Sequence, residues 1–121
     1  MCIRDSDYRV QGRDEESAKT IISNAILLES LGVSALVLEC IPSDLAKTVS
    51  EKLKIPTVGI GACSDCDGQV LVSYDMLVIT KGKQPRFVRN FLNNQNSISD
   101  AVETFIAEVK EGNFPSQSES Y

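Results

Sequence analysis

The feature that constrains the fold most is a short apolar run, Ala-Leu-Val-Leu-Glu-Cys at residues 35–40, between two segments with helical patterns. An apolar, β-prone run of this length is typical of a strand covered on both faces in a parallel sheet. A similar run at residues 57–61 follows roughly 20 residues later. This alternation of strands and helices predicts an α/β barrel or a doubly wound sheet.

Helical periodicity surrounds these strands. Apolar residues recur at helical spacing over residues 14–31, where the first turn is acidic. A second helix is expected over residues 43–53, with Ser43 as its N-cap. Farther along we expect a short helix at residues 86–92 and a longer one at residues 97–111, which starts with a pattern resembling a capping box.

The segment after the second strand allows two interpretations. Residues 70–72 look like a strand. A parallel crossover from the strand at residues 57–61 needs about a dozen residues or more, and only residues 62–69 lie between the two. Either the two strands form an antiparallel hairpin, or Asp67 caps a short helix at residues 68–75 that leads to a strand at residues 77–80. We favour the helix because it preserves the alternation of strand and helix.

The composition argues against several classes of function. The 121 residues carry a formal net charge of −5, and their 12 lysines and arginines are scattered, which argues against a nucleic-acid partner. No apolar run reaches the roughly 20 residues of a membrane span, and the N-terminus lacks the apolar core of a signal peptide. We therefore expect a cytoplasmic protein with reduced cysteines and no membrane partner.

Two features at strand ends are candidates for chemistry. Glu39 ends the first apolar strand, where barrel and open-sheet enzymes place active residues; alternatively it caps the next helix or pairs with an arginine. Gly59 and Gly61, with Ala62, lie in a glycine-rich loop that could bind a ligand through backbone N–H groups. The alternative for this loop is a tight turn after a buried strand.

Cys63 and Cys66 form a single CxxC motif in the same loop. This spacing raises a redox role or half of a zinc site. The sequence has no histidine and no second CxxC, so zinc would need Cys2 or Cys40 to approach from distant positions. Chance spacing of two reduced thiols is therefore the interpretation we favour.

Several longer motifs occur in a distinctive order. They are Leu-Val-Leu-Glu-Cys-Ile-Pro at residues 36–42, Ile-Pro-Thr-Val-Gly-Ile-Gly-Ala at 55–62, and Cys-Asp-Gly-Gln-Val-Leu-Val at 66–72 followed by Asp75, with flanking blocks at 8–13, 86–91 and 108–115. In content, order and spacing these motifs resemble the ketopantoate hydroxymethyltransferase family. The resemblance extends over residues 8–121.

The resemblance implies a fold and a reaction. The family has a (β/α)₈ TIM barrel of the phosphoenolpyruvate/pyruvate superfamily, of which this chain would supply the C-terminal part. The implied enzyme is a Mg²⁺-dependent homo-oligomer. It transfers a hydroxymethyl group from the folate co-substrate, 5,10-methylenetetrahydrofolate, to the 2-oxo acid 3-methyl-2-oxobutanoate, giving 2-dehydropantoate in pantothenate biosynthesis.

The resemblance also implies site residues. By motif, Glu39 corresponds to the catalytic base that removes the C3 proton. Gly59, Gly61 and Ala62 stay candidates for a substrate loop from their position alone, and the family often has another glycine where Cys63 stands. The family's metal ligands lie on earlier strands, so we name no metal ligand in this chain.

We accordingly divide the chain into three segments. Residues 1–7 are expected to be a non-family or truncated start, residues 8–112 a partial barrel with roughly the last three strands, and residues 113–121 a polar, mobile tail. We expect the isolated chain to be inactive, because an open barrel has unpaired strand edges. Two alternatives remain open: another Mg²⁺-dependent 2-oxo-acid lyase, or a noncatalytic ligand-binding α/β module.

Overall fold

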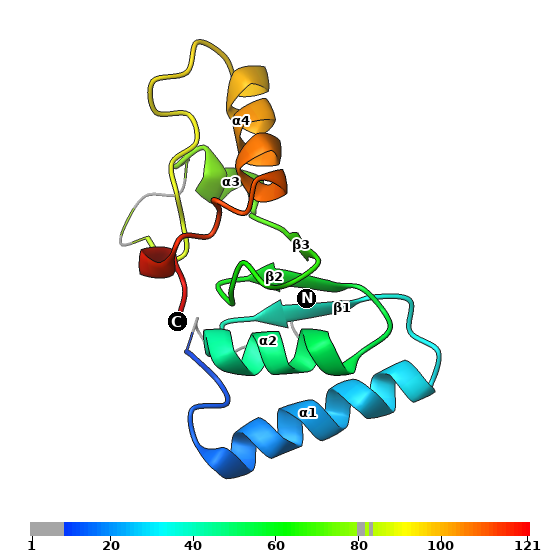
Figure 1. The fold of residues 1–121 in the computed structure, drawn as a ribbon. Coiled ribbons are helices and arrows are strands. Elements are labelled where there is room, and N and C mark those ends of the chain that lie inside the picture. The colour runs from blue at the N-terminus through cyan, green and yellow to red at the C-terminus, as the bar shows by residue number, and fades with distance from the viewer. Residues whose placement is uncertain (1–8, 80–81, 83) are drawn as a thin grey trace.

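The structure, a computed structural model, describes residues 9–79, 82 and 84–121 (Figure 1). Helices α1 and α2 lie on one side of a small sheet, and α3 and α4 lie on the other (Figure 1). In chain order the elements are α1 (Glu15–Ser30), β1 (Leu36–Glu39), α2 (Ser43–Lys52), β2 (Thr57–Ile60), β3 (Gly68–Gln69), α3 (Ser73–Met76), α4 (Ile98–Lys110) and a short 3-10 helix (Gln117–Glu119).

The three strands form one parallel sheet in the order β1-β2-β3. Strands β1 and β2 pair along their length, with Leu36 opposite Thr57 and Glu39 opposite Ile60. The chain is therefore a mixed α/β protein with a parallel sheet. The two strands expected near residues 35–40 and 57–61 are confirmed, and so is the helix that connects them.

A first core fills the space between the sheet and the two N-terminal helices. Helix α1 begins after Asp14, whose carboxylate accepts a hydrogen bond of 2.8 Å from the Ser17 N–H and so caps the helix. The helices expected over residues 14–31 and 43–53 are confirmed. Apolar side chains from both helices pack against the helix-facing side of the sheet: Ala25, Leu38, Ile41, Leu45, Ala46, Val49 and Leu53 are buried together.

A second core lies on the other side and is dominated by phenylalanines. The rings of Phe91, Phe105 and Phe114 meet edge to face with centroids 5.2–5.7 Å apart, an arrangement that aromatic pairs favour. Arg89 lies over two of these rings and binds both carboxylate oxygens of Glu119, at 2.7 and 2.6 Å. This core joins α4 to the C-terminal segment.

The structure corrects the prediction for the third strand. Gly68 and Gln69 form a strand parallel to β2, so the alternative hairpin is wrong, and the favoured helix at residues 68–75 is reduced to the single turn of α3 at Ser73–Met76. The short connection suffices because β3 has only two residues, and the loop returns only about 7 Å along the sheet. Asp67 does not cap a helix; its carboxylate accepts hydrogen bonds from the Thr57 N–H and hydroxyl, at 2.8 and 3.0 Å.

Other local predictions after β3 are also wrong. Residues 77–79 form a turn and not a strand, while residue 80 lies outside the described residues. Residues 86–92 form turns and irregular backbone instead of a helix, because Phe87 and Phe91 are both buried in the second core. The long helix at residues 97–111 is confirmed, and the Ser97 side chain caps it by accepting from the Asp100 N–H.

The C-terminal segment at residues 113–121 is packed and not a free tail. Phe114 is buried in the second core, and Ser116 and Glu119 form a capping box around the 3-10 helix. The expectation of mobility overlooked these anchors because the segment is mostly serine and polar by composition. Residues 1–7, expected to be a foreign start, lie outside the described residues, so that prediction stays a prediction.

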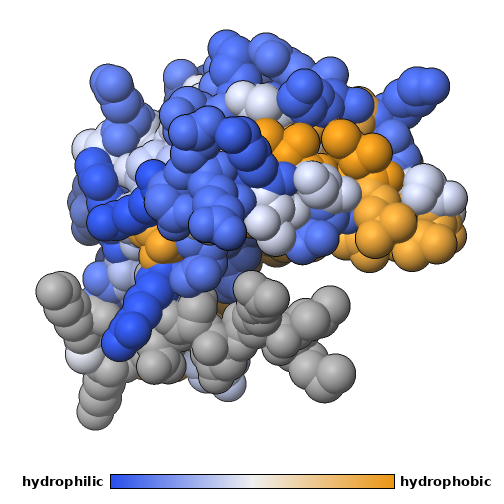
Figure 2. Space-filling model, turned by 90° about the horizontal axis from the view of Figure 1, so that it is seen from below, coloured by the Kyte–Doolittle hydropathy of each residue, from blue (hydrophilic) through white to orange (hydrophobic). Residues whose placement is uncertain are grey.

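One exposed apolar area lies on the outer side of α1. Figure 2 views the molecule from below and shows apolar side chains gathered toward one end of this face. The exposed large apolar side chains near the C-terminal end of α1 are Ile26, Leu27, Leu28 and Leu31. Within the described ranges, every helix is too short or too polar to cross a membrane.

Candidate active site

Glu39 stands at the carboxyl end of β1, as the sequence predicted. Successive residues of a strand point to opposite faces, so Leu38 faces the helices and joins the first core, whereas Val37 and Glu39 face the other side. That side is open at this strand, because Val37 is 59% exposed and Glu39 is exposed too. The carboxylate can therefore be reached by a molecule that approaches the open face of the sheet.

The residue after Glu39 turns the chain sharply. Cys40 is buried and adopts a left-handed backbone conformation with φ of 48°, which is uncommon for a residue other than glycine. Its N–H donates to the Ile60 carbonyl at 3.0 Å, and its carbonyl accepts from the Gln11 N–H at 2.9 Å. These bonds fix the end of β1 between β2 and the segment before α1, and they hold the backbone that carries Glu39.

Ser43 ties three segments together at the same edge of the sheet. Its hydroxyl lies 3.1 Å from the Ala62 carbonyl and 2.8 Å from the Tyr121 main-chain oxygen, and its N–H donates to the latter at 2.7 Å. A hydroxyl has one proton, so it shares that proton between the two acceptors. The prediction of Ser43 as the N-cap is wrong: Pro42 occupies that position and makes no side-chain cap.

Side chains of this chain occupy the space beside the glycines of the glycine-rich loop. A Cβ atom added to Gly59 would lie 2.8 Å from Gln69 Oε1, and one added to Gly61 would lie 2.6 Å from the Phe87 ring. Gly61 also has a φ of 60°. Ala62 is fully buried. The close approach that the glycines predicted is therefore made by Gln69 and Phe87, and a substrate contact by Gly59, Gly61 and Ala62 stays a prediction.

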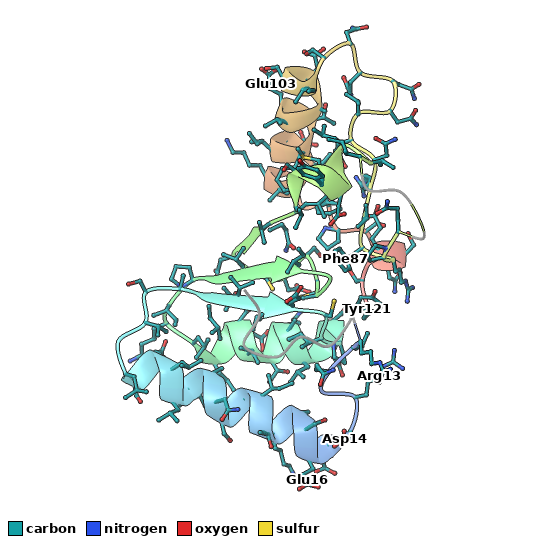
Figure 3. All side chains as sticks on the ribbon, turned by 180° about the vertical axis from the view of Figure 1, so that it is seen from behind. Arg13, Asp14, Glu16, Phe87, Glu103 and Tyr121 are labelled. Atoms are coloured by element: carbon teal, nitrogen blue, oxygen red, sulfur yellow. The ribbon has the colours of Figure 1, made fainter. Side chains whose placement is uncertain are left out.

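Aromatic and basic side chains complete this edge of the sheet. Figure 3 shows Phe87 and Tyr121 near each other where the strands end, with Arg13 beside Tyr121. The Phe87 and Tyr121 rings meet edge to face with centroids 6.5 Å apart, and the Arg86 guanidinium lies 5.8 Å from the Tyr121 ring. Burial raises the pKa of the Tyr121 phenol, so it stays protonated at neutral pH.

The described residues do not assemble a metal site. Nowhere in residues 9–79, 82 and 84–121 do three or more His, Cys, Asp or Glu side chains gather closely enough to hold a metal ion. A Mg²⁺ site built from this part of the chain alone therefore does not fit the structure. Two open hollows, of about 610 and 340 Å³, flank the start of α1, and neither is lined by Glu39.

The sequence located the strand end but missed what surrounds it. Glu39 and the loop at residues 59–62 follow adjacent strands, and pairing of β1 with β2 brings them to one edge. Sequence patterns gave no signal for Ser43 as a bridge or for Tyr121 at this edge, since both contacts join positions far apart in the chain. The glycine at position 61 was a usable signal in the sequence. Its φ is positive, and glycine is the usual residue in that conformation.

Comparison with known proteins identifies relatives. The sequence pattern of the family described as ketopantoate hydroxymethyltransferase matches residues 3–117. The protein named 3-methyl-2-oxobutanoate hydroxymethyltransferase from Ruthia magnifica is 54% identical over 114 residues, which are 94% of this chain and 44% of the relative. Proteins of the same name from Buchnera aphidicola of Schizaphis graminum and from Helicobacter pylori strain G27 are 50% and 44% identical, covering 96% and 97% of this chain. The chain spans 43–44% of the length of these relatives.

Proposed function

Because this chain belongs to the ketopantoate hydroxymethyltransferase family, we propose that it is part of an enzyme that transfers a hydroxymethyl group from 5,10-methylenetetrahydrofolate to 3-methyl-2-oxobutanoate. The product would be 2-dehydropantoate, in the pantothenate pathway. The names of the relatives support a hydroxymethyltransferase over a lyase or a noncatalytic module. The reaction of the whole enzyme is a proposal because this chain spans less than half of those relatives.

In this proposal Glu39 is the general base. It removes the proton from C3 of the 2-oxo acid, and the resulting enolate attacks the one-carbon unit of the folate. The observation that supports this role is the placement of Glu39 at the carboxyl end of a parallel strand, on the open face of the sheet. Mg²⁺ dependence belongs to the whole enzyme, and no step is assigned to the metal through residues of this chain.

We also propose that the described sheet is a section of a (β/α)₈ barrel. Supporting observations are the parallel order of the strands and the helices packed on one side of β1 and β2. In a closed barrel the inward side chains of each strand are covered by those of other strands, whereas here Val37 is 59% exposed. The remainder of the barrel would cover Val37 and provide the other walls of the substrate site.

Two further properties follow for the whole enzyme. It is cytoplasmic and homo-oligomeric, and the exposed apolar side chains of α1 (Ile26, Leu27, Leu28 and Leu31) are consistent with a contact between subunits. The isolated chain is inactive because it supplies one wall of the site and its described residues gather no set of side chains that could hold the metal. Gly59, Gly61 and Ala62 contribute by fixing the loop beside Glu39.

The proposal is tested with a chimera. Residues 9–121 replace the matching segment of the Ruthia magnifica relative, which is 54% identical here and supplies the rest of the enzyme. We expect the chimera to convert 3-methyl-2-oxobutanoate to 2-dehydropantoate only when the folate donor is present, and the 121-residue chain alone to form no product. Carbon–carbon cleavage of the product without hydroxymethyl transfer would support the lyase instead. A folded chimera without either activity would contradict the proposal.

A further inference from the structure

Cys63 and Cys66 flank a tight turn, a relationship that the proposed reaction does not use. Residues 64 and 65 form the turn between them, and both cysteines are free thiols. A four-residue turn brings its end Cα atoms within about 7 Å, and disulfides join Cα atoms about 4.4–6.8 Å apart. Both side chains are buried in the protein. A disulfide can therefore close with little movement of the backbone.

The surroundings of the pair favour a thiolate on Cys66. The Cys63 thiol and the Cys63 N–H both act as donors toward its sulfur, whereas the Thr57 hydroxyl proton is given to Asp67. Gly59 leaves room for the Cys66 sulfur, because a Cβ atom at position 59 would lie only 3.2 Å from Cys66 Sγ. A charged sulfur with several donors is stabilised even where little water reaches it.

The two thiols differ in character as a result. Donation from the Cys63 thiol lowers the pKa of Cys66 to about 6, against the opposing effect of burial. The same hydrogen bond, together with burial, raises the pKa of Cys63, which stays protonated. The charged groups near the turn are Asp65, which lies 3.5 Å from the Lys47 ammonium, and Asp67, which binds Thr57. One nucleophilic thiolate beside one protonated thiol is the arrangement of a reactive pair.

We propose that Cys63 and Cys66 form a dithiol that hydrogen peroxide oxidises reversibly to a disulfide across the turn. Peroxide is small enough for a pair that is only 3% and 8% exposed. The Cys66 thiolate attacks one peroxide oxygen; an S–O bond forms, the O–O bond breaks, and hydroxide leaves, giving a sulfenic acid. The Cys63 sulfur then attacks the Cys66 sulfur, the S–O bond breaks, and the Cys63 proton leaves with the hydroxyl group as water.

Atoms and electrons balance over these two steps. The two thiols lose two protons and two electrons, which convert one peroxide into two waters. A dithiol reductant returns the pair to two thiols by thiol–disulfide exchange. Cys63 directly follows Ala62, so the disulfide changes the loop beside Glu39; that consequence rests on the proposed function, whereas formation of the disulfide does not.

The test uses the whole 121-residue chain and needs no enzymatic activity. Trypsin releases residues 55–81 as one peptide, which contains Cys63 and Cys66 and no other cysteine. After peroxide treatment at pH 7 and alkylation, we expect this peptide to lose two hydrogens and to resist alkylation until a dithiol reductant is added. In the same sample the buried Cys40 should remain alkylatable after unfolding. A peptide that keeps two alkylatable thiols, or that oxidises no faster than in the urea-unfolded chain, would overturn the proposal.

Two variants separate the roles of the thiols. In Cys63→Ser the sulfenic acid on Cys66 has no partner, so we expect dimedone to trap it on residue 66. In Cys66→Ser the remaining thiol is Cys63. We expect it to react with peroxide at least tenfold more slowly than Cys66 reacts in Cys63→Ser. For the unmodified chain, the oxidation rate should level off above a midpoint near pH 6, the pKa of Cys66. A midpoint near 8.5, that of an ordinary thiol, or equal reactivity of the two variants, would contradict the assignment.

Discussion

Replacing Gly61 by alanine should destabilise the chain through two separable effects. Gly61 has a φ of 60°, a conformation that costs an alanine roughly 1 kcal/mol or slightly more. The added Cβ would also lie 2.6 Å from the ring of Phe87, which is 1% exposed and has no room to withdraw. Overpacking of this kind costs about 1–3 kcal/mol. Together, Gly61→Ala should lower the free energy of unfolding by about 2–4 kcal/mol.

Urea unfolding followed by circular dichroism measures this loss, and the chimera serves as host if the chain alone is too unstable. The matched control is Gly68→Ala, because an added Cβ there meets nothing within 4 Å and no positive φ is involved. We expect the control to change stability by no more than about 0.5 kcal/mol.

A double variant tests the clash itself. In Gly61→Ala with Phe87→Leu the smaller side chain leaves room for the new methyl group. The double variant should therefore be more stable than the sum of the single effects predicts, by about 1–2 kcal/mol. The reasoning is refuted if Gly61→Ala costs less than about 0.5 kcal/mol, or if the two substitutions act additively.

Three further predictions concern the contacts that hold the site. Ser43→Ala should lower the free energy of unfolding by about 1 kcal/mol in urea titrations, because the Ala62 carbonyl and the Tyr121 main-chain oxygen lose a shared donor; no change would contradict the bridge. Arg89→Lys should cost about 1 kcal/mol by the same measurement although it keeps the charge, because lysine cannot bind both oxygens of Glu119; equal stability would argue against the bidentate contact. Hydrogen bonds from Thr57 lower the pKa of Asp67, so its contribution is complete above the usual aspartate pKa of 3.8 and is lost as the pH falls through its lower folded value. Stability measured from pH 5 to 2 should therefore fall less steeply in Asp67→Asn, and an unchanged slope would contradict this.

Local sequence patterns predicted the parts of the fold that local physics controls. The helix at residues 14–31 has an apolar stripe and a capping Asp14, so its signal lies within one segment. The strand that ends at Glu39 is likewise marked by its own composition. By contrast, β3 depends on the carboxylate of Asp67, which binds Thr57 ten residues earlier. That contact let a short loop replace the crossover helix that the alternation of elements had suggested.

The candidate site divides in the same way. The position of Glu39 was predictable, because a carboxylate at the end of an apolar strand stands out from its neighbours. The positions of Phe87 and Tyr121 were not, since they depend on packing of the C-terminal segment against the end of the sheet. The turns near Phe87 also show that burial of two phenylalanines outweighed a weak local preference for helix.

Glu39 is proposed to remove the C3 proton of the 2-oxo acid, and deuterium exchange at C3 reports this step by itself. The chimera is incubated with 3-methyl-2-oxobutanoate in D₂O without the folate, and exchange at C3 is followed by NMR. A lost general base typically costs 10²–10⁴-fold, so Glu39→Gln should slow exchange by about that factor while the 2-oxo acid still binds. The exposed Glu51→Gln on α2 is the matched control and should exchange at the unmodified rate. Undiminished exchange in Glu39→Gln would mean that another group removes the proton and that Glu39 is not the base.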